Sequence, residues 1–423
     1  MIKKLVFIYL IIIVLWSHNS MAQSTYSTYS ILGIGDYIDP AVPAAMGMGG
    51  LGISNSSYWY LNNTNPALLY NQRIALFSAG VLAETKNISQ EGFESTTAGT
   101  GNLNHIAMAF PLIRDKMSFS LGLQPFTSMN YAFTYDYELE GSLDEQVVIL
   151  NQGKGGISSF HIAVGGVVYK GLSLGVKASY LFSSYQKESS SLTSADYPHY
   201  IANYLQRQSV GGFLFGTGVA YKQKIGEYQL GLGFIYEIPT AIDGKQFVRI
   251  EQRTLTNQVV FADTIVNNEP NKVGIPTTVG GGISFGKPQK WMLGFDYKMQ
   301  DWSGLNSNNS TFVQNFTESK KYIFGGEYTP DAFDVKSYFK RITFRAGFTF
   351  EEKPYLLENK QISEFGINFG WTLPVARFSS LDFGVMIGSR GTTENNLVKE
   401  DFFKVYFGAS FNDNRWFLRP KFN

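Results

Sequence analysis

The segment Ile342-Thr343-Phe344-Arg345-Ala346-Gly347-Phe348-Thr349-Phe350 decides the fold. Every second residue in it is apolar or aromatic, and the residues between are small, polar or charged. Successive side chains of a strand point to opposite faces, so this period of two predicts a β-strand with one apolar and one polar face. The same alternation recurs along 172–182, 365–372 and 403–411.

The connections between such segments distinguish a membrane barrel from a water-soluble sandwich, which also alternates. Short connections at 112–115, 170, 224–226 and 287–288 alternate with long polar ones at 85–102, 136–155, 188–207, 238–272, 302–318, 352–361 and 391–400. Tight turns on one side and long loops on the other are typical of outer-membrane β-barrels with an even number of strands. The connection at 329–339 is longer than its place among the tight turns predicts.

The fold class expected is therefore all-β, a transmembrane antiparallel barrel of about fourteen strands. The strands are expected near 74–84, 103–111, 116–135, 156–169, 171–187, 208–223, 227–237, 273–286, 289–301, 319–328, 340–351, 362–374, 379–390 and 401–411.

Composition supports a surface wetted by lipid. Aromatic residues make up 15% of the 423 residues and charged residues only 16%, against about 25% charged residues in a typical soluble domain. The net charge of +1 comes without a concentrated basic face, so no nucleic-acid partner is expected. The chain has no cysteine, which excludes disulfides and thiolate metal sites.

The N-terminus predicts export. Lys3 and Lys4 precede an apolar run, 5–15, and the small residues Ser20 and Ala22 stand at the −3 and −1 positions of a cleavage site. The alternative, a membrane-anchoring helix, would need about 20 apolar residues. We therefore expect a signal peptide over 1–22 and a location in the bacterial outer membrane.

Aromatic residues near the expected strand ends are candidates for the girdles at the membrane interfaces. These residues are Tyr169, Tyr180, Tyr221, Tyr236, Trp291, Trp302, Tyr328 and Trp371.

The segment 23–73 lacks alternation and is rich in Gly, Pro, Ala, Asn and Tyr. Its small apolar residues favour burial, so we expect an irregular plug, or hatch, inside the barrel. The barrel itself is expected over 74–411. The basic and aromatic tail, 412–423, is expected in the periplasm, where it would fold back on the barrel or contact a partner.

Short motifs in this chain resemble the FadL family of hydrophobic-compound transporters. The resemblance spans most of the chain, but each motif is short. The motifs are the segment 29–36, the glycine-rich 46–50, the Asn65-Pro66-Ala67 step before the first strand, Gly274-Ile275-Pro276 with Trp291, Asp296, Tyr297 and Trp302, and the strand segment 345–348.

This resemblance implies passive uptake of hydrophobic small molecules such as fatty acids, with lateral release into the membrane beside a kinked third strand and a hatch that blocks a straight pore. In this chain the third expected strand contains Gln124-Pro125-Phe126. Proline lacks the backbone donor of the ladder, so either a break with a lateral opening or the end of the membrane part of the strand is expected there.

No enzymatic site, metal or cofactor is expected. Gly47, Gly49 and Gly52 match a dinucleotide fingerprint, but no strand precedes them and no amphipathic helix follows. After the expected signal peptide the histidines are His105, His161 and His199, which are scattered in sequence. We interpret His161, near Ser158 and Ser159, as a polar residue facing the lumen rather than as a catalytic base.

The acidic residues of the long loop at 136–155 lack the regular spacing of metal ligands and predict a solvated loop. They are Asp136, Glu138, Glu140, Asp144 and Glu145.

Two functions follow from these expectations. The favoured one is passive uptake of hydrophobic small molecules. The alternative is a non-transporting structural or accessory subunit of a larger outer-membrane complex, in secretion or barrel assembly, whose long outer loops bind protein partners. The partners expected are therefore outer-membrane lipid, a hydrophobic small molecule or other subunits, because fold alone does not settle function.

Overall fold

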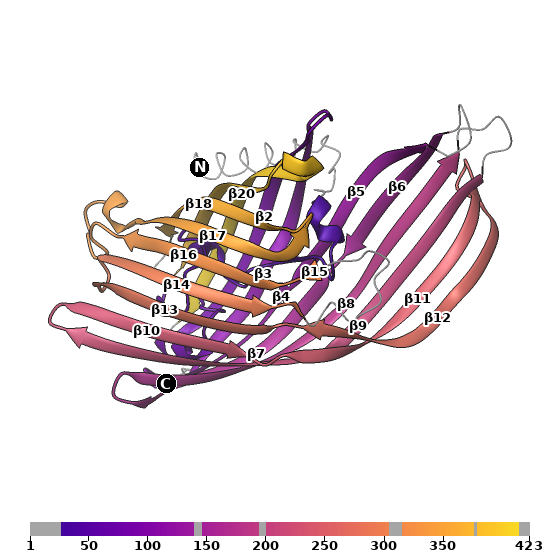
Figure 1. Cartoon of the computed structure of the whole chain (residues 1–423). Coiled ribbons are helices and arrows are strands. Elements are labelled where there is room, and N and C mark those ends of the chain that lie inside the picture. Colours follow the sequence, from indigo (N-terminus) through magenta and orange to yellow (C-terminus); the bar gives the residue numbers. More distant parts are fainter. Residues whose placement is uncertain (1–26, 139–145, 194–199, 304–314, 376–378, 414–423) are drawn as a thin grey trace, which may run out of the picture.

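The computed structural model describes residues 27–138, 146–193, 200–303, 315–375 and 379–413. These residues form a closed antiparallel β-barrel of fourteen strands, as predicted (Figure 1). The expected signal peptide, His199, most of the acidic run and most of the C-terminal tail lie outside the described residues.

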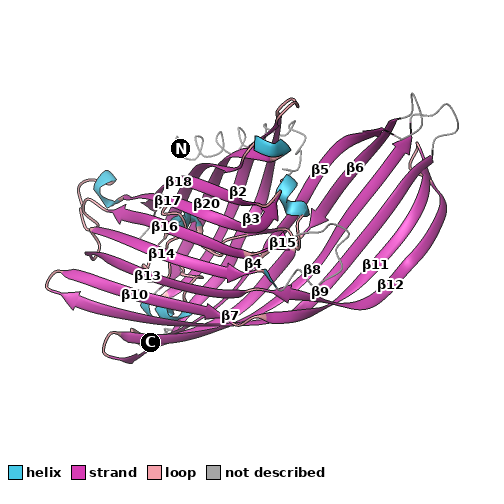
Figure 2. Ribbon diagram, in the orientation of Figure 1, coloured by secondary structure: helices cyan, strands magenta, loops and turns pink. Residues whose placement is uncertain are grey.

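Strands dominate the described chain, with a few short helical turns (Figure 2). The helical elements are η1 (Thr28–Ile31), α2 (Pro43–Met46), η2 (Pro66–Asn71), η4 (Phe339–Arg341) and η5 (Glu394–Asn396). The strands are β1 (Asp36–Tyr37), β2 (Ala75–Gln90), β3 (Thr96–Ile113), β4 (Met117–Pro125), β5 (Thr127–Glu138), β6 (Gln146–Gly155), β7 (Ile157–Tyr169), β8 (Leu172–Thr193), β9 (Tyr200–Ile225), β10 (Tyr228–Glu237), β11 (Thr240–Thr254), β12 (Val259–Ile275), β13 (Thr277–Lys287), β14 (Trp291–Asp301), β15 (Asn315–Phe316), β16 (Glu318–Tyr328), β17 (Thr343–Leu357), β18 (Lys360–Pro374), β19 (Ser380–Gly391) and β20 (Val398–Asp413).

Five of the fourteen barrel strands are each divided into two segments. They are β4 with β5, β6 with β7, β10 with β11, β12 with β13, and β15 with β16. The ring closes between the first and last strands, where Ala75 lies opposite Asp413 and Gln90 opposite Val398. Closure removes the sheet edges that hydrocarbon cannot hydrogen-bond.

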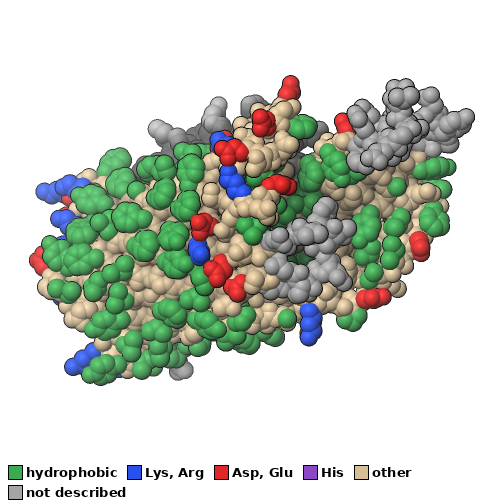
Figure 3. All heavy atoms as spheres, in the orientation of Figure 1, with side chains coloured by type: hydrophobic (Ala, Val, Ile, Leu, Met, Phe, Trp, Pro, Cys, Tyr) green, Lys and Arg blue, Asp and Glu red, His purple; other side chains and the backbone are tan. Residues whose placement is uncertain are grey.

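The outward face of the barrel is apolar, as the alternation predicts. In β18 the outward residues Phe365, Ile367 and Phe369 are about half exposed, while Asn368 between them is fully buried. Hydrophobic side chains gather over the barrel wall in the left half of Figure 3. Within the described ranges no helix is long and apolar enough to cross a membrane.

On one side of the barrel the strands extend far beyond the part of the wall whose outward face is apolar. The strands β5, β6, β8, β9, β11 and β12 are neighbours in this order and project to the right in Figure 1. We call this six-stranded extension the wing. The pairing of β11 with β9 runs from Asp243 opposite Gly211 to Thr254 opposite Tyr200, which is roughly 35–40 Å of strand.

The wing corrects the prediction that 136–155, 188–207 and 238–272 are loops. Most of the described residues in these ranges are strands. Both faces of β12 are exposed along most of its length. A strand without a buried face has no reason to alternate, so period-two hydrophobicity does not reveal it.

One further expectation needs correction, and the long connection after β16 has its own local structure. Trp302, a predicted girdle residue, is buried next to Tyr37 rather than facing the membrane interface. The long connection at 329–342 contains η4, and the Asp334 carboxylate accepts hydrogen bonds from the backbone of Lys336 and Ser337. The backbone N–H of Asp331 donates to the Lys340 carbonyl, so this connection is a folded turn.

Candidate functional site

The N-terminal segment, residues 27–73, contacts the inner face of strands all round the ring. Helix α2 packs against β18, β19 and β20, and η2 packs against β4, β7, β8 and β9. Met48 and Leu51, both fully buried, reach the wall at β16, β17 and β14. The segment therefore packs against the barrel wall on several sides of the ring.

Asn65-Pro66-Ala67 forms the start of η2. The Asn65 side-chain oxygen accepts a hydrogen bond from the Ala67 backbone N–H (3.0 Å), which satisfies one of the free donors at a helix N-terminus. The Asn65 amide also donates to the carbonyls of Ile53 (2.7 Å) and Val219 (3.3 Å). One side chain thus ties two parts of the segment to strand β9.

Three glycines make room for this turn in the barrel wall. Gly165 lies opposite Gly175, and Gly175 lies opposite Gly218, on the neighbouring strands β7, β8 and β9. A Cβ atom at any of the three would overlap with Pro66 or Asn65. The wall and the turn are therefore in direct backbone contact, which only glycine permits.

A second pair of glycines makes room for the N-terminal segment on the opposite wall of the barrel. Gly325 of β16 is paired with Gly347 of β17, and a Cβ atom on either would meet Met48. Gly347 belongs to the segment 342–350, whose alternation predicts β17. Its close contact with Met48 is a second role, which the alternation alone does not reveal.

Gln124-Pro125-Phe126 lies where a barrel strand is divided. Strand β4 ends at Pro125, Phe126 is unpaired in the ladder, and β5 begins at Thr127. The neighbouring strand is divided at the same level, where Gly156 separates β6 from β7. The Phe126 N–H donates to the Ile157 carbonyl (2.7 Å) and holds the two breaks together.

Strands β3 and β5 separate beyond this break. The pairing of β3 with β4 covers Ile106 to Ile113. Within the part of the chain that the structure describes, the outer half of β3 pairs only with β2. Figure 1 shows β5 turning away from β3 toward the wing.

The N-terminal segment takes the place of β3 along the free edge of β5. In β1, Asp36 and Tyr37 lie opposite Ser128 and Thr127. The Ile38 N–H donates to the Phe126 carbonyl (3.0 Å), and the Ser27 N–H donates to the Asn130 carbonyl (2.9 Å). The segment thereby covers the backbone of the break.

The N-terminal segment connects the Asn65-Pro66-Ala67 motif to the Gln124-Pro125-Phe126 motif. Asn63, two residues before Asn65, donates its side-chain amide to the Gln124 side-chain oxygen (3.2 Å). Phe126 is buried and makes an edge contact with Tyr37, with ring centroids 5.3 Å apart.

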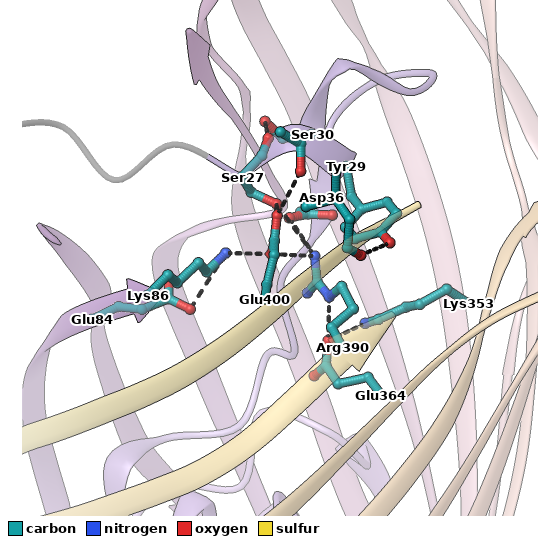
Figure 4. Close-up of polar contacts among 12 residues, drawn as sticks. Ser27, Tyr29, Ser30, Asp36, Glu84, Lys86, Lys353, Glu364, Arg390 and Glu400 are labelled. Atoms are coloured by element: carbon teal, nitrogen blue, oxygen red, sulfur yellow. Dashed lines mark hydrogen bonds and ion pairs between the residues drawn. The ribbon is translucent and has the colours of Figure 1, made fainter. Parts of the chain in front are cut away.

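A buried network of charges joins the same segment to the barrel (Figure 4). At its centre the Arg390 guanidinium contacts the Asp36 carboxylate (2.8 Å) and the Glu364 carboxylate (2.6 Å). The Glu400 carboxylate is fully buried and accepts a hydrogen bond from the Ser27 hydroxyl (3.0 Å).

Lysines complete the network. Lys86 contacts Glu400 (3.4 Å), and Lys353 contacts Glu364 (3.3 Å). Sequence reasoning did not identify these residues, although Glu84 and Lys86 stand two positions apart on one face of β2. Charged residues at lumen-facing positions of several strands were the signal that could have found them.

The charges lower the pKa of two carboxyls in the N-terminal segment. Burial opposes ionisation of Asp36, but Arg390 and then Lys86 outweigh it and lower the pKa of Asp36 to about 2. Burial likewise opposes ionisation of Asp39, and the ammonium groups of Lys298 (3.2 Å) and Lys321 (2.8 Å) hold its pKa well below the usual range. Both carboxylates are therefore ionised at neutral pH and bind the segment to the wall.

Two of the cavities that the described residues form between the segment and the wall are lined by charges. One has a volume of about 120 Å³ and is lined by five carboxylates and five basic groups. The other, about 40 Å³, contains Lys177, Glu237 and Lys298 in its wall. A small-molecule site usually has about 300–1,000 Å³ and a mostly apolar lining. Neither cavity fits a hydrophobic molecule.

His105 is not isolated in space, although the histidines are scattered in sequence. Its Nε2 lies 2.8 Å from the Ser78 hydroxyl and its Nδ1 lies 2.7 Å from the Asn104 side-chain oxygen. A bulge in β3 turns both Asn104 and His105 inward, since Gly80 lies opposite His105 and Val81 opposite Leu103. Ser78 and His105 line neither of the two cavities, so we interpret the trio as a buried hydrogen-bond network.

His161 faces the lumen and is buried, as expected. Among the described residues no group of three His, Cys, Asp or Glu side chains is arranged to hold a metal ion.

Comparisons with known proteins agree with this architecture. The model of the BamG family matches residues 1–423. No match is found among curated proteins.

Several solved structures share the fold. The P. putida toluene transporter TodX is 13% identical, with a TM-score of 0.59, and the match covers 89% of this chain and 99% of that chain. The CymD monoaromatic hydrocarbon channel is 13% identical (TM-score 0.58; 89% and 99%). A Pseudomonas aeruginosa FadL homologue is also 13% identical (TM-score 0.57; 90% and 99%). The resemblance to the FadL family is thus confirmed for the fold.

Proposed function

We propose that this chain, which belongs to the BamG family, is an accessory subunit of a protein-assembly machine in the bacterial outer membrane and does not itself transport. The match of the family model over the whole chain supports this accessory role over transport. In this proposal residues 23–73 are a hatch that stays in place, and the wing offers its surface to other subunits.

The buried charges between the N-terminal segment and the barrel wall are the observation that supports the proposal. A hydrophobic solute is stabilised by leaving water for an apolar site, whereas buried charges are stable only beside their partners. In this barrel the Arg390–Asp36 pair and the Ser27–Glu400 hydrogen bond occupy the route between hatch and wall. An apolar molecule entering there would have to separate ion pairs without replacing them.

The proposal is tested by depletion of the protein from its own cell, followed by quantitative proteomics of the outer membrane. We expect unrelated β-barrel proteins to decrease, and the wild-type gene to restore them. Unchanged amounts of all other barrels after complete depletion would contradict an assembly role.

A second candidate function is uptake of hydrophobic small molecules through a lateral opening beside Gln124, Pro125 and Phe126. The divided strand and the separation of β3 from β5 favour it. The named function of TodX, a toluene transporter, agrees with it.

Radiolabelled toluene and long-chain fatty acid distinguish the two candidates when the protein and TodX are produced in the same uptake-deficient cells. The accessory proposal predicts uptake at the level of the empty vector, with TodX as the positive control. Uptake well above the empty vector would support the second candidate.

A further inference from the structure

One connection at the short-turn end of the barrel carries exposed apolar side chains. Residues 329–342 join β16 to β17, and this connection is longer than the turns that join β3 to β4, β7 to β8 or β13 to β14. The exposed fractions of Phe333, Val335 and Phe339 are 71%, 96% and 76%. In outer-membrane barrels the end with short turns faces the periplasm. Exposed apolar groups that gather in one place mark a binding surface.

The connection holds its shape through its own polar contacts. The Asp334 carboxylate accepts a hydrogen bond from the Ser337 backbone N–H (2.6 Å) and contacts the Lys340 ammonium group (3.0 Å). These two contacts lower the pKa of Asp334 to about 2, so the carboxylate is ionised at neutral pH. The Arg341 guanidinium lies over the Tyr338 ring, 5.3 Å from its centroid. The apolar side chains are therefore presented by a folded turn.

Aromatic residues of the barrel wall mark the level of the membrane interface beside this connection. Trp291 lies opposite Tyr328, and Tyr328 lies opposite Phe344, on the neighbouring strands β14, β16 and β17. Tyr328 and Phe344 are each about half exposed. Aromatic rings gather at the level of the lipid headgroups. The connection starts at the residue after Tyr328 and ends two residues before Phe344, so it leaves and rejoins the wall at this level.

Cations stand beside the apolar side chains. Lys336 is exposed within the connection, and Arg341 lies at its end. The neighbouring turn contributes Lys290, whose carbonyl accepts a hydrogen bond from the Thr329 N–H (2.8 Å). Figure 3 shows basic and hydrophobic side chains together at the left-hand end, where the loop between β16 and β17 lies in Figure 1. Apolar side chains interleaved with Lys and Arg are typical of segments that lie in a membrane interface.

We propose that residues 329–342 are an interfacial anchor that inserts Phe333, Val335 and Phe339 into the periplasmic leaflet of the outer membrane and binds anionic phospholipid headgroups. Transfer of the apolar side chains from water to the acyl boundary is favourable. The neighbouring cations are attracted by the phosphate groups. The inference goes beyond the proposed function and does not depend on it, since both candidate functions place the barrel in the same bilayer.

An acidic protein is the other partner that this chemistry could bind. The position of the connection favours lipid. Its two ends adjoin Tyr328 and Phe344 on the outward face of the wall, where acyl chains are present before any protein binds. The apolar side chains can therefore reach hydrocarbon without a further partner.

The depth of the anchor is measurable because the chain has no cysteine. Val335→Cys gives one site for a nitroxide label on the full-length barrel in vesicles of phosphatidylethanolamine and phosphatidylglycerol. We expect this label to collide readily with oxygen, which dissolves among acyl chains, and to be shielded from a water-soluble nickel chelate. Gln289→Cys, in the exposed turn between β13 and β14, is the matched control, and nickel should reach its label several-fold more often.

Two outcomes of this measurement would overturn the anchor. One is a label at position 335 that nickel reaches as often as it reaches the control. The other is shielding that appears in native outer membranes but not in vesicles that contain no other protein, because a protein partner would then be the cover. Shielding in the vesicles supports insertion into lipid.

The headgroup preference has its own test. Native mass spectrometry counts the lipids that the barrel retains from vesicles with equal fractions of the two phospholipids. We expect phosphatidylglycerol to be enriched on the wild type, and its binding to weaken roughly fivefold in Lys336→Gln and in Arg341→Gln. Lys360→Gln, at the opposite end of β18, is the control and should keep the enrichment. Heat-modifiable migration confirms that each variant is folded. Equal lipid ratios in all four proteins would overturn the headgroup binding.

Discussion

Arg390 of β19 contacts Asp36 of the N-terminal segment at 2.8 Å, although the two residues are 354 positions apart in the chain. The same guanidinium contacts Glu364 of β18. One side chain thus connects the N-terminal segment to two neighbouring barrel strands. This relationship is the basis of the first two predictions.

Substitution Arg390→Gln is expected to destabilise the barrel by about 3–5 kcal/mol, because it leaves Asp36 and Glu364 buried with less compensation. The measurement is the shift of the guanidinium unfolding midpoint in detergent. The matched control is Lys360→Gln, which breaks the exposed pair with Glu394 (2.7 Å) and should change stability by less than about 1 kcal/mol. Equal effects of the two variants would contradict a structural role for the network.

Acid is expected to loosen the segment. The pKa of Asp36 is lowered in the folded state to about 2, so its ionised form stabilises the fold above about pH 4. That stabilisation, about 2 kcal/mol, is lost as the pH falls from about 4 to 2. Hydrogen exchange of residues 27–39 should accelerate over this interval, and Asp36→Asn should make the exchange less dependent on pH. Identical pH profiles for the two proteins would contradict the assignment.

The wall glycines that contact the turn at Asn65 and Pro66 are not expected to tolerate a side chain. Gly175→Val should force the turn at Asn65 and Pro66 off the wall and lower stability by about 1–3 kcal/mol or more. Gly281→Val is the control, because a Cβ atom there meets no neighbour within 4 Å. Hydrogen exchange of the amides in η2 should increase in Gly175→Val only. Unaltered exchange in that variant would show that the turn does not depend on the glycine contact.

Asn65→Ala is expected to weaken the start of η2. The lost cap accounts for about 1 kcal/mol, and the carbonyls of Ile53 and Val219 lose their shared donor. The Ala67 amide should exchange faster than in the wild type. Asn71→Ala, at the other end of η2, leaves this cap intact and should not affect Ala67.

Local sequence predicts the barrel because each strand carries its own evidence. Alternation from Ile342 to Phe350 identifies β17 without any knowledge of its neighbours, and lipid on one side enforces it. The break at Phe126 also has a local cause in Pro125. Expected and observed strands therefore agree within the membrane.

Two features depend on partners far away in sequence and were not predictable. Strand β12 has no buried face over most of its length, so alternation does not mark it. The Arg390–Asp36 pair depends on the path of the N-terminal segment, which lacks periodicity. Trp302 shows the same limit, since its burial beside Tyr37 is decided by that path.

Native mass spectrometry after gentle extraction tests the central claim most directly. The account predicts a barrel bound in fixed proportion to other outer-membrane subunits, without a stoichiometric fatty acid or hydrocarbon. A barrel that is released without partners and carries one such apolar molecule per chain would contradict it.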